Sequence, residues 1–363
     1  MCGGGVLMKA AFWYGTRDVR IKEIDEPSPG PGEVKIKVKW CGICGSDLHE
    51  YLNGPMSIPV ENHPLTKKKA PVQLGHEFSG EITEVGRGAS SFRPGDRVVC
   101  EATLSCMHCP ACSRGDFTHC EKMGIYGISG YGGGFAEYTL AKKEFVHKIP
   151  DNLDFEKAAL AEPVAVGFHS VTESGFVPGK NAVVLGGGPI ALGVIESLKA
   201  SGARKIIAVV RKSVRQSYAA RSGADIVLDP DVCDAAAEII RLTGGGADFC
   251  FETFGTAPGP EIGIKCLGSR GTLVIISLWN EDVPVDLMRV VQKEIRIVGS
   301  NLYTGDDFEA VLSLLSDGRI PAEGYITGRV PLDELVTKGF EELSGPDKKK
   351  HVKIIVTPDE SLL

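Results

Sequence analysis

The feature that most constrains this chain is a run of four cysteines within the fifteen residues from 106 to 120. Their spacing is C-x2-C-x2-C-x7-C, and no other stretch is so restricted; the cysteines are Cys106, Cys109, Cys112 and Cys120. Thiols clustered in this way favour one bound metal ion that fixes the surrounding chain as a lobe. Four thiolates fill a tetrahedral zinc shell, so we expect this metal to hold structure and not to carry out the chemistry.

The bulk properties exclude several classes of protein. A chain of 363 residues exceeds one ordinary core and predicts two domains. Its net charge of −7 disfavours nucleic acid and anionic membranes as partners, and no apolar run approaches the roughly 20 residues that span a bilayer. The 11 cysteines are an odd number in a chain without a recognisable export signal, so metal ligands are favoured over disulfides. We therefore expect a cytoplasmic enzyme that acts on a small molecule.

Two patterns divide the sequence. Residues 9–14, 19–24 and 34–40 read as strands, and the strict alternation of apolar and charged side chains at 34–40 predicts half-exposed antiparallel strands. From Ala182 onward, short apolar strands alternate with helical segments, which is the rhythm of a doubly wound parallel sheet. A last strand at 352–357 is expected to return to the first module. The predicted fold class is therefore α/β, with a β-rich catalytic domain at 1–163 and 302–363 and a Rossmann cofactor-binding domain at 164–301.

A glycine-rich turn marks the expected cofactor site. The segment Gly186-Gly187-Gly188-Pro189-Ile190-Ala191 matches the dinucleotide-binding pattern G-x-G-x-x-G/A. It follows a buried strand and opens a helix, which is the context that the pattern requires. Glycine allows a tight turn and lets a pyrophosphate approach the backbone amides at the helix N-terminus. The expected cofactor-binding residues are therefore Gly186, Gly188, Pro189, Ile190 and Ala191.

The end of the next predicted strand favours one nicotinamide cofactor over the other. NAD sites place Asp or Glu there to accept a hydrogen bond from the ribose 2′-hydroxyl. This chain has Val210-Arg211-Lys212-Ser213 and no carboxylate. Arg211 or Lys212 would pair with a 2′-phosphate, so we predict NADP(H) in preference to NAD(H). The alternative is that both residues are solvated surface cations of an NAD enzyme.

A second candidate metal set is less conspicuous. Cys44, His76 and Glu162 supply sulfur, nitrogen and oxygen from three separated segments, and Glu77 adjoins His76. Three protein ligands and one open position are what a catalytic zinc site needs. Cys44 lies in a glycine-flanked turn after a predicted strand, and His76 lies just before another strand. Spacing alone does not select these residues from other Cys and His sets.

Taken together and in this order, the motifs resemble those of one protein family. The matching segments are Cys41–His49, Gly75–Gly80, the four-cysteine lobe, Gly133–Tyr138, Glu162-Pro163, Gly186–Ala191 and Tyr303–Phe308. Over essentially its whole length the chain resembles the zinc-dependent medium-chain dehydrogenase/reductase family, and most of all its 2,3-butanediol dehydrogenase-like branch. The resemblance implies that the β-rich catalytic domain is GroES-like.

The resemblance also implies two zinc ions per chain. Cys44 and His76 would hold a catalytic zinc together with Glu162, and Glu77 would be a close neighbour or an exchanging ligand. Whether Glu162 or Glu77 binds this metal directly stays open. The four-cysteine lobe would hold a structural zinc that is closed to substrate.

Further roles follow from the same resemblance. Asp47 would orient His76 and fix its tautomer. Ser46 would accept the substrate proton and pass it, by way of the cofactor ribose, towards His49. Lys353 would lie near the cofactor pyrophosphate. The chain would assemble as a homodimer or homotetramer.

The predicted function is hydride transfer between NADP(H) and a secondary alcohol or ketone, such as a diol or a hydroxyketone. Two departures from the butanediol branch bear on it: Val210 replaces the expected acidic residue, and the loop Tyr51–Lys69 has its own sequence, so the substrate need not be butanediol. One alternative is an NAD-dependent polyol, butanediol or threonine-type dehydrogenase. Another, from a different class, is a non-catalytic nucleotide-binding sensor.

Overall fold

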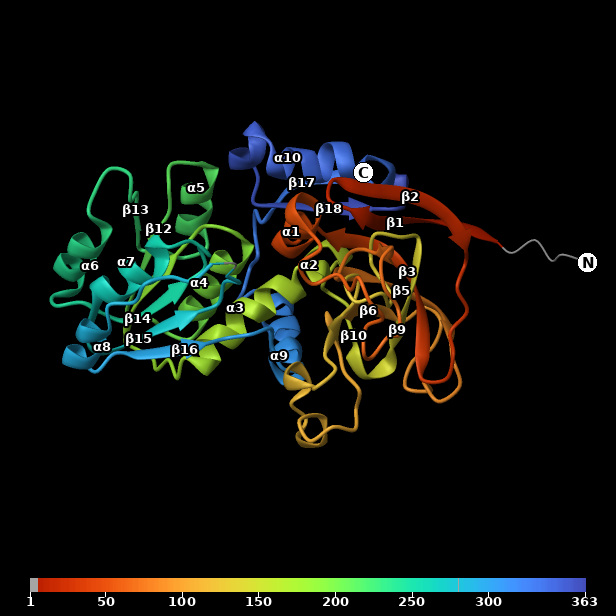
Figure 1. Cartoon of the computed structure of the whole chain (residues 1–363), viewed down its shortest axis with the longest axis horizontal. Helices are drawn as coiled ribbons and strands as arrows, with labels where there is room; N and C mark the ends of the chain where they lie inside the picture. Colours follow the sequence, from red (N-terminus) through yellow and green to blue (C-terminus); the bar gives the residue numbers. More distant parts are fainter. Residues whose placement is uncertain (1–5, 280) are drawn as a thin grey trace, which may run out of the picture. The chain divides into compact units, whose positions relative to one another are not determined.

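Two units, each built around its own β-sheets, make up the chain (Figure 1). The computed structural model describes residues 6–279 and 281–363. Unit 1 contains the chain up to Glu162 together with Thr304–Ser316 and Ile326–Leu363, and unit 2 contains Pro163–Tyr303 and Asp317–Tyr325. The first unit is rich in antiparallel strands and the second alternates strands with helices, which confirms the predicted α/β class.

One segment differs from the predicted domain boundaries. The sequence places all of 302–363 in the catalytic domain, whereas Asp317–Tyr325 belongs to unit 2. Glu196 accepts a hydrogen bond from the backbone amide of Ala322 at 3.3 Å, and Gly324 lies so close to the ring of Tyr218 that a β-carbon there would approach it to 2.7 Å. These contacts join segments that are far apart in the chain, so no local pattern reveals them.

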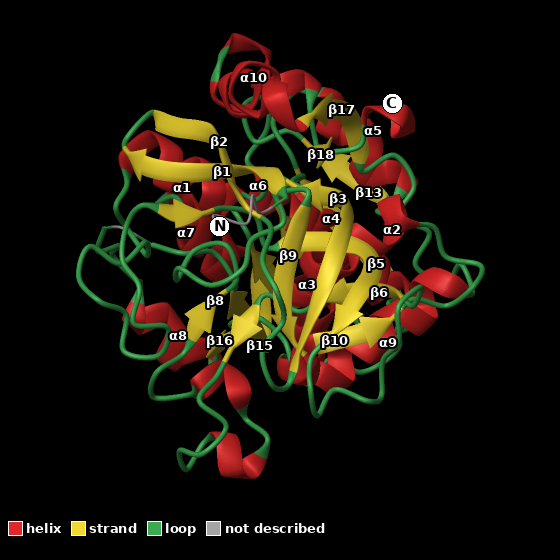
Figure 2. Cartoon of the chain, turned by 90° about the vertical axis from the view of Figure 1, so that its right-hand side faces the viewer, coloured by secondary structure: helices red, strands yellow, loops and turns green. Residues whose placement is uncertain are grey.

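A seven-stranded sheet organises unit 1. Its strands are β3 (Glu33–Gly42), β5 (Glu77–Val85), β6 (Arg97–Cys100), β9 (Tyr138–Lys142), β10 (Val146–Lys148), β17 (Ile326–Pro331) and β18 (Lys353–Thr357). The order is β10-β6-β5-β3-β18-β17, and β9 also pairs with β3. Figure 2 shows β3, β5, β6 and β10 side by side. All these pairs are antiparallel except β17–β18, so the last strand returns to the first module as predicted.

A three-stranded sheet and several helices complete the parts of unit 1 that bear on function. The sheet has the order β2-β1-β4, with β1 at Leu7–Gly15, β2 at Asp18–Asp25 and β4 at Val72–Gln73. In β1, Met8 and Ala10 are buried while Lys9 between them is exposed, which is the alternation that the sequence predicts for a half-exposed strand. The helices are α1 (Gly45–Asn53), α2 (Phe155–Ala159), α9 (Gly305–Ser316) and α10 (Glu341–Ser344).

Unit 2 is a doubly wound parallel sheet. Its strands are β11 (Asn181–Leu185), β12 (Lys205–Val209), β13 (Ile226–Leu228), β14 (Ala247–Glu252), β15 (Leu267–Ile275) and β16 (Arg296–Gly299). They are all parallel and lie in the order β13-β12-β11-β14-β15-β16, which is the order of a dinucleotide-binding Rossmann fold. The apolar run at 182–185 is fully buried at the centre of this sheet.

Helix α3 (Ala161–Glu173) begins in the last residues of unit 1 and precedes the first strand of this sheet. The helices that connect the strands in sequence are α4 (Pro189–Ala200), α5 (Val214–Arg221), α6 (Ala235–Thr243), α7 (Pro258–Cys266) and α8 (Leu287–Lys293). Across the part of the chain that the structure describes, no helix is both long enough and apolar enough to cross a membrane.

Candidate metal centres and cofactor site

Strand pairing in unit 1 brings the less conspicuous metal set together. Gly42 at the end of β3 lies opposite Glu77 at the start of the antiparallel strand β5. Cys44 and His76 lie just beyond these two positions, so residues from distant segments meet at one edge of the sheet. One ligand atom from each of Cys44, His76 and Glu77 lies within 4.8 Å of the other two.

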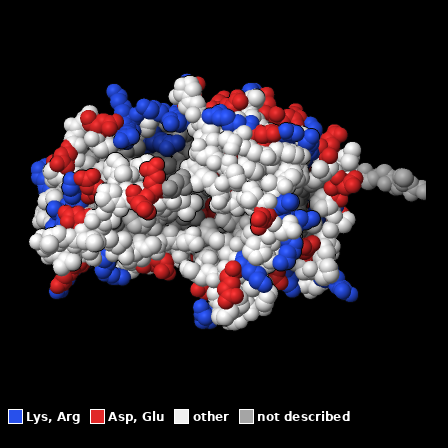
Figure 3. Space-filling view, viewed as in Figure 1, with Lys and Arg blue, Asp and Glu red and all other residues white. Residues whose placement is uncertain are grey.

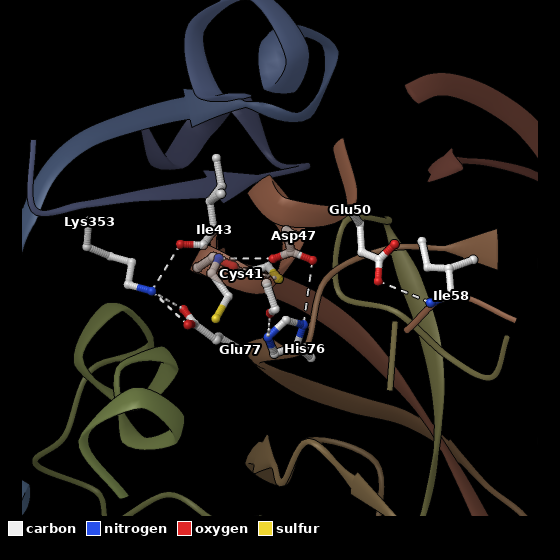
Figure 4. Close-up of polar contacts among 11 residues, drawn as sticks. Cys41, Ile43, Asp47, Glu50, Ile58, His76, Glu77 and Lys353 are labelled. Atoms are coloured by element: carbon white, nitrogen blue, oxygen red, sulfur yellow. Dashed lines mark hydrogen bonds and ion pairs between the residues drawn. The ribbon is translucent and has the colours of Figure 1, made fainter. Parts of the chain in front are cut away.

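The first turn of α1 orients the histidine. Cys44 precedes this helix, and its backbone amide donates a hydrogen bond to one carboxylate oxygen of Asp47 at 3.0 Å. The other oxygen of Asp47 lies 3.6 Å from Nδ1 of His76 (Figure 4). This arrangement favours the tautomer with its proton on Nδ1, which leaves the Nε2 lone pair for a metal ion.

The two residues predicted to relay the substrate proton lie on the same helix. The hydroxyl oxygen of Ser46 lies 3.2 Å from Nε2 of His76, directly beside the nitrogen that would bind the metal. His49 is three residues further along α1, one turn away, and its side chain is exposed. Ser46 therefore lies at the metal pocket and His49 lies towards solvent.

Negative charge collects around this pocket. The side chains of Asp47 and His76 are almost completely buried. Burial alone would lower the pKa of His76, but Asp47, Cys44 and Glu162 outweigh it and hold that pKa well above its usual value. Burial also raises the pKa of Asp47. A sulfur, a nitrogen and carboxylate oxygens gathered in an excess of negative charge are a donor set that suits Zn²⁺.

Glu77 has a buried counterion that the sequence did not reveal (Figure 4). Lys353 donates to both carboxylate oxygens of Glu77, at 2.7 and 2.6 Å, and to the carbonyl oxygen of Ile43 at 3.0 Å. Burial alone would lower the pKa of Lys353, but Glu77 and other nearby anions outweigh it and raise that pKa. The three contacts match the three ammonium protons, so Lys353 serves the metal pocket of unit 1. The expectation that Lys353 also lies near the cofactor pyrophosphate stays a prediction.

Glu162 reaches the same pocket from the first turn of α3. Its side chain is buried, and its charge helps to raise the pKa of both His76 and Lys353. The tightest cluster of ligand atoms contains Glu77, whose oxygens Lys353 holds. Both carboxylates that the sequence singled out thus belong to this pocket.

The four-cysteine lobe has the geometry of a closed metal site. The sulfur of Cys109 accepts hydrogen bonds from the backbone amides of Cys112 and Glu121, which lowers the pKa of that thiol to about 6. The short strands β7 (Thr103–Leu104) and β8 (Gly124–Ile125) pair at the base of the lobe. One sulfur from each of its four cysteines lies within 4.8 Å of the other three: Cys106, Cys109, Cys112 and Cys120.

The glycine-rich turn of unit 2 leaves its backbone open to close approach by a ligand. Gly186 has φ +134°, and a β-carbon there would collide with the hydroxyl of Thr253, so only glycine fits. Gly188 immediately precedes α4, whose first residues are Pro189 and Ile190. Ala191 is fully buried, as a small residue at the third position of the pattern should be. The turn and the N-terminus of α4 together present backbone amides where the pattern predicts a pyrophosphate.

The cations expected to select the cofactor lie at the surface. The Arg211 side chain is 72% exposed and lies 3.4 Å from the carboxylate of Asp231, and Lys212 is exposed. A third cation, Arg215, is only partly exposed on the first turn of α5. Arg215 was not among the residues predicted from the sequence; its place in the first helical turn after β12 was the available signal.

Comparisons with known proteins give the site its context. Residues 30–151 match the family model of the alcohol dehydrogenase GroES-like domain, and residues 189–317 match that of the zinc-binding dehydrogenase. The (R,R)-butanediol dehydrogenase of Bacillus subtilis (strain 168) is 45% identical over 97% of this chain and 100% of that protein. A sorbitol dehydrogenase of Halalkalibacterium halodurans is 35% identical over 95% of this chain and 97% of its own length.

Solved structures agree with these sequence matches. The crystal structure of 2R,3R-butanediol dehydrogenase from Bacillus subtilis superposes with a TM-score of 0.91 at 45% identity, covering 97% of this chain and 100% of that one. A Sinorhizobium meliloti 1021 protein described as a zinc-binding dehydrogenase, and bound to NADP, superposes with a TM-score of 0.88 at 30% identity. The second match covers 97% of this chain and 100% of the other.

Proposed function

Because the chain belongs to the zinc-dependent medium-chain dehydrogenase/reductase family, in its butanediol dehydrogenase branch, we propose that it interconverts a secondary diol or hydroxyketone and the corresponding ketone with NADP(H). The chain is an alcohol dehydrogenase acting on CH–OH groups, which excludes the alternative of a non-catalytic nucleotide-binding sensor. The observation that carries the proposal is the cluster of partly buried Cys44 with buried His76 and Glu77, and with Asp47 behind the histidine ring.

Each side chain of the pocket has a separate role in the proposed reaction. We assign Cys44, His76 and Glu162 to the catalytic zinc, because Lys353 already neutralises Glu77 and keeps it as a close neighbour. When bound, the zinc polarises the substrate oxygen, and the nicotinamide takes up or gives the hydride. Asp47 holds the His76 ring in the orientation and tautomer that the metal requires. Ser46, next to Nε2 of His76, takes the hydroxyl proton of the substrate and passes it towards exposed His49.

The NADP(H) preference rests on unit 2. Val210 ends the strand region where an NAD enzyme carries Asp or Glu, and cations follow it. One structural relative holds NADP at 30% identity, which is compatible with the same choice here. The sorbitol dehydrogenase relative favours a second candidate, a polyol dehydrogenase that uses NAD.

A substrate and cofactor matrix tests these proposals. Purified enzyme is assayed with 2,3-butanediol, acetoin, diacetyl and sorbitol, each with the NADP(H) and the NAD(H) couple. We expect the highest kcat/KM for acetoin or diacetyl with NADPH. A highest kcat/KM for sorbitol with NAD would select the polyol reading, and a preference for NADH with acetoin would refute only the cofactor part.

We also infer that the enzyme is a homo-oligomer through the edge of its parallel sheet. β16 is the last strand of that sheet, and Ile297 on it is 45% exposed. Helix α8 exposes Leu287, Met288 and Val291 by 67%, 66% and 73%. An edge strand with exposed apolar neighbours can pair with the same strand of a second subunit across a twofold axis. Ile297→Lys should shift the mass measured by light scattering to that of the monomer, and an unchanged mass would contradict the inference.

A cytoplasmic location is part of the proposal. The ten cysteines that the structure describes form no disulfide. Two candidate metal sets that contain free thiols are typical of a reducing compartment. Fractionation of cells that make the protein should recover it with cytosolic marker enzymes.

A further inference from the structure

A second buried carboxylate lies on the same face of α1 as Asp47. Asp47 and Glu50 are three residues apart, so they lie on one side of the helix, and both side chains are buried. Asp47 faces His76, whereas Glu50 faces the loop that follows the helix (Figure 4). The proposed reaction assigns no role to Glu50, although a carboxylate is rarely buried without a specific partner.

The partners of Glu50 are three consecutive backbone amides of this loop. Its carboxylate accepts hydrogen bonds from the amides of Met56 at 2.9 Å and Ile58 at 3.1 Å, and the amide of Ser57 between them also donates to it. Successive amides that converge on one anion form a concave turn of backbone around it. Hydrogen bonds to an ionised group are also stronger than those between neutral groups. One side chain of α1 thus fixes the shape of the loop at Met56–Ile58.

The charge of Glu50 is balanced by amides and not by a cation. Over residues 6–279 and 281–363, no ion pair includes Glu50, whereas Glu77 in the metal pocket pairs with Lys353. Figure 3 shows a largely uncharged surface on unit 1 where Figure 1 draws α1. Removal of the Glu50 charge would therefore weaken the hold on the loop without leaving a cation unpaired.

Glu50 also connects α1 to the first strand, and the chain returns closely past it. Its carbonyl oxygen accepts a hydrogen bond from the indole nitrogen of buried Trp13 on β1 at 2.9 Å. A β-carbon built on Gly54 would lie 2.6 Å from Oε2 of Glu50 and 2.4 Å from its carbonyl oxygen. Glycine is therefore needed at position 54, because any side chain there would displace the carboxylate.

The contact leaves the outer side chains of the loop free. Ile58 is buried, while Met56 is 41% exposed and Ser57 is exposed. The helix that carries Glu50 also presents the hydroxyl oxygen of Ser46 at 3.2 Å from Nε2 of His76. A loop that is already held in one conformation pays less ordering entropy when a ligand binds than a loop that orders on binding.

We propose that Glu50 is a positioning residue for substrate binding, because it holds the loop at Met56–Ile58 in one conformation against the helix that carries Ser46. This inference rests on the proposed function, which places the substrate at the metal pocket next to that helix. It names the residue that shapes the loop Tyr51–Lys69, where this chain has its own sequence. Glu50 acts through the loop and does not touch the reacting atoms.

Two variants of the full-length enzyme weaken the contact in different ways. Glu50→Gln keeps the size of the side chain, but its amide nitrogen donates, so at least one of the three loop amides loses its acceptor. Gly54→Ala leaves Glu50 intact and places a methyl group where its carboxylate lies. Glu61→Gln is the matched control, since Glu61 is an exposed carboxylate in the same loop.

The measurements separate the loop from the chemistry. Hydrogen–deuterium exchange follows the amides of residues 54–60 and needs no substrate. Metal analysis gives the zinc content. Steady-state kinetics give kcat and KM for whichever of 2,3-butanediol, acetoin, diacetyl and sorbitol the wild type prefers, at saturating cofactor.

In both Glu50→Gln and Gly54→Ala, the amides of Met56–Ile58 should exchange about 10-fold faster than in wild type, because their acceptor is weakened. KM should rise by about 10-fold while kcat changes by less than about threefold, because the loop must then be ordered when substrate binds. Zinc content should equal that of wild type. Glu61→Gln should match wild type in every measurement.

Unchanged exchange in both variants would overturn the inference, since Glu50 would then not hold the loop. Faster exchange with an unchanged KM, or with a loss confined to kcat, would also contradict it and leave Glu50 a role in folding alone. A wild-type enzyme that turns over none of the four compounds would refute the proposed function, and the exchange rates would still decide whether Glu50 holds the loop.

Discussion

The two candidate metal sets of unit 1 differ in how the chain assembles them. The lobe takes its four sulfurs from one short stretch closed by β7 and β8. The pocket at Cys44 and His76 takes its ligands from the end of β3, the start of β5 and the start of α3, and it depends on strand register. Local spacing is enough to specify a structural site, whereas a site that needs an open position and a substrate is assembled by the whole domain.

The largest effect expected from this difference is the loss of turnover in Cys44→Ser. Removal of the thiolate should lower kcat/KM on the order of 10⁴-fold, because metal polarisation supplies several kcal/mol of transition-state stabilisation. The melting temperature should stay close to wild type, because backbone pairing, and not the metal ligands, joins β3 to β5. Metal analysis should find one zinc per chain in place of two.

Cys233→Ser is the matched control for this substitution. Cys233 is a partly buried thiol in unit 2, outside both metal sets, and its sulfur contacts the carbonyl oxygen of Asp229. Its zinc content and kcat/KM should equal those of wild type. An active Cys44→Ser enzyme with two zincs would break the assignment of this pocket as the catalytic one.

The next largest effect is the loss of stability expected when the buried ion pair between Lys353 and Glu77 is broken. In Lys353→Met, Glu77 would keep a buried charge without its partner, which should lower the free energy of unfolding by about 3–5 kcal/mol. Urea unfolding measures this. The double variant Lys353→Met/Glu77→Gln removes both charges and should be more stable than the single one. Equal destabilisation in the two variants would show that packing, and not charge pairing, holds this part of the pocket together.

Cys109→Ser should have a smaller and more local effect. Loss of one ligand releases the zinc of the lobe, and its metal-dependent folding free energy is lost with it. Because the lobe is a short segment closed by its own strands, we expect a global loss of roughly 3 kcal/mol and rapid proteolysis within 106–120. The kcat/KM of the intact fraction should remain within about threefold of wild type. Intact stability with lost turnover would reverse the roles of the two metals.

The same contrast explains what could be predicted from the sequence. Alternating and continuous apolar patterns indicated the strands of both units, because burial on one or two faces leaves a direct mark on residue order. The lobe and the turn at Gly186 were predicted because all their residues are neighbours in the chain. Residue type and setting singled out Cys44 and His76 as candidates, and motif resemblance then selected them and added Asp47; their meeting depends on the register of β3 and β5.

What could not be predicted depends on contacts between distant segments. Nothing local to Lys353 shows that β18 brings its ammonium group to Glu77, and nothing near Ala322 shows that it bonds to Glu196. Arg215 was missed for a different reason. The cations at 211 and 212 are nearer to Val210 in sequence, but the first turn of α5 returns Arg215 to the glycine-rich turn.

The smallest expected effect is a change in zinc affinity. It distinguishes the two metal sets because each contains an aspartate next to a histidine, and only one of these histidines is a predicted ligand. Asp47→Asn keeps the shape of the side chain and removes the charge behind His76, from which its Oδ1 lies 3.6 Å. Weaker orientation of the imidazole should lower zinc affinity at the catalytic pocket by about 10- to 100-fold, measured by competition with a chelator. In the lobe, Asp116 lies 2.6 Å from Nδ1 of exposed His119, which is not among the four ligands. Asp116→Asn should therefore leave both zinc affinities unchanged. If the two substitutions weakened zinc binding equally, the charge of Asp47 would act through the general field of the domain and not through the orientation of His76.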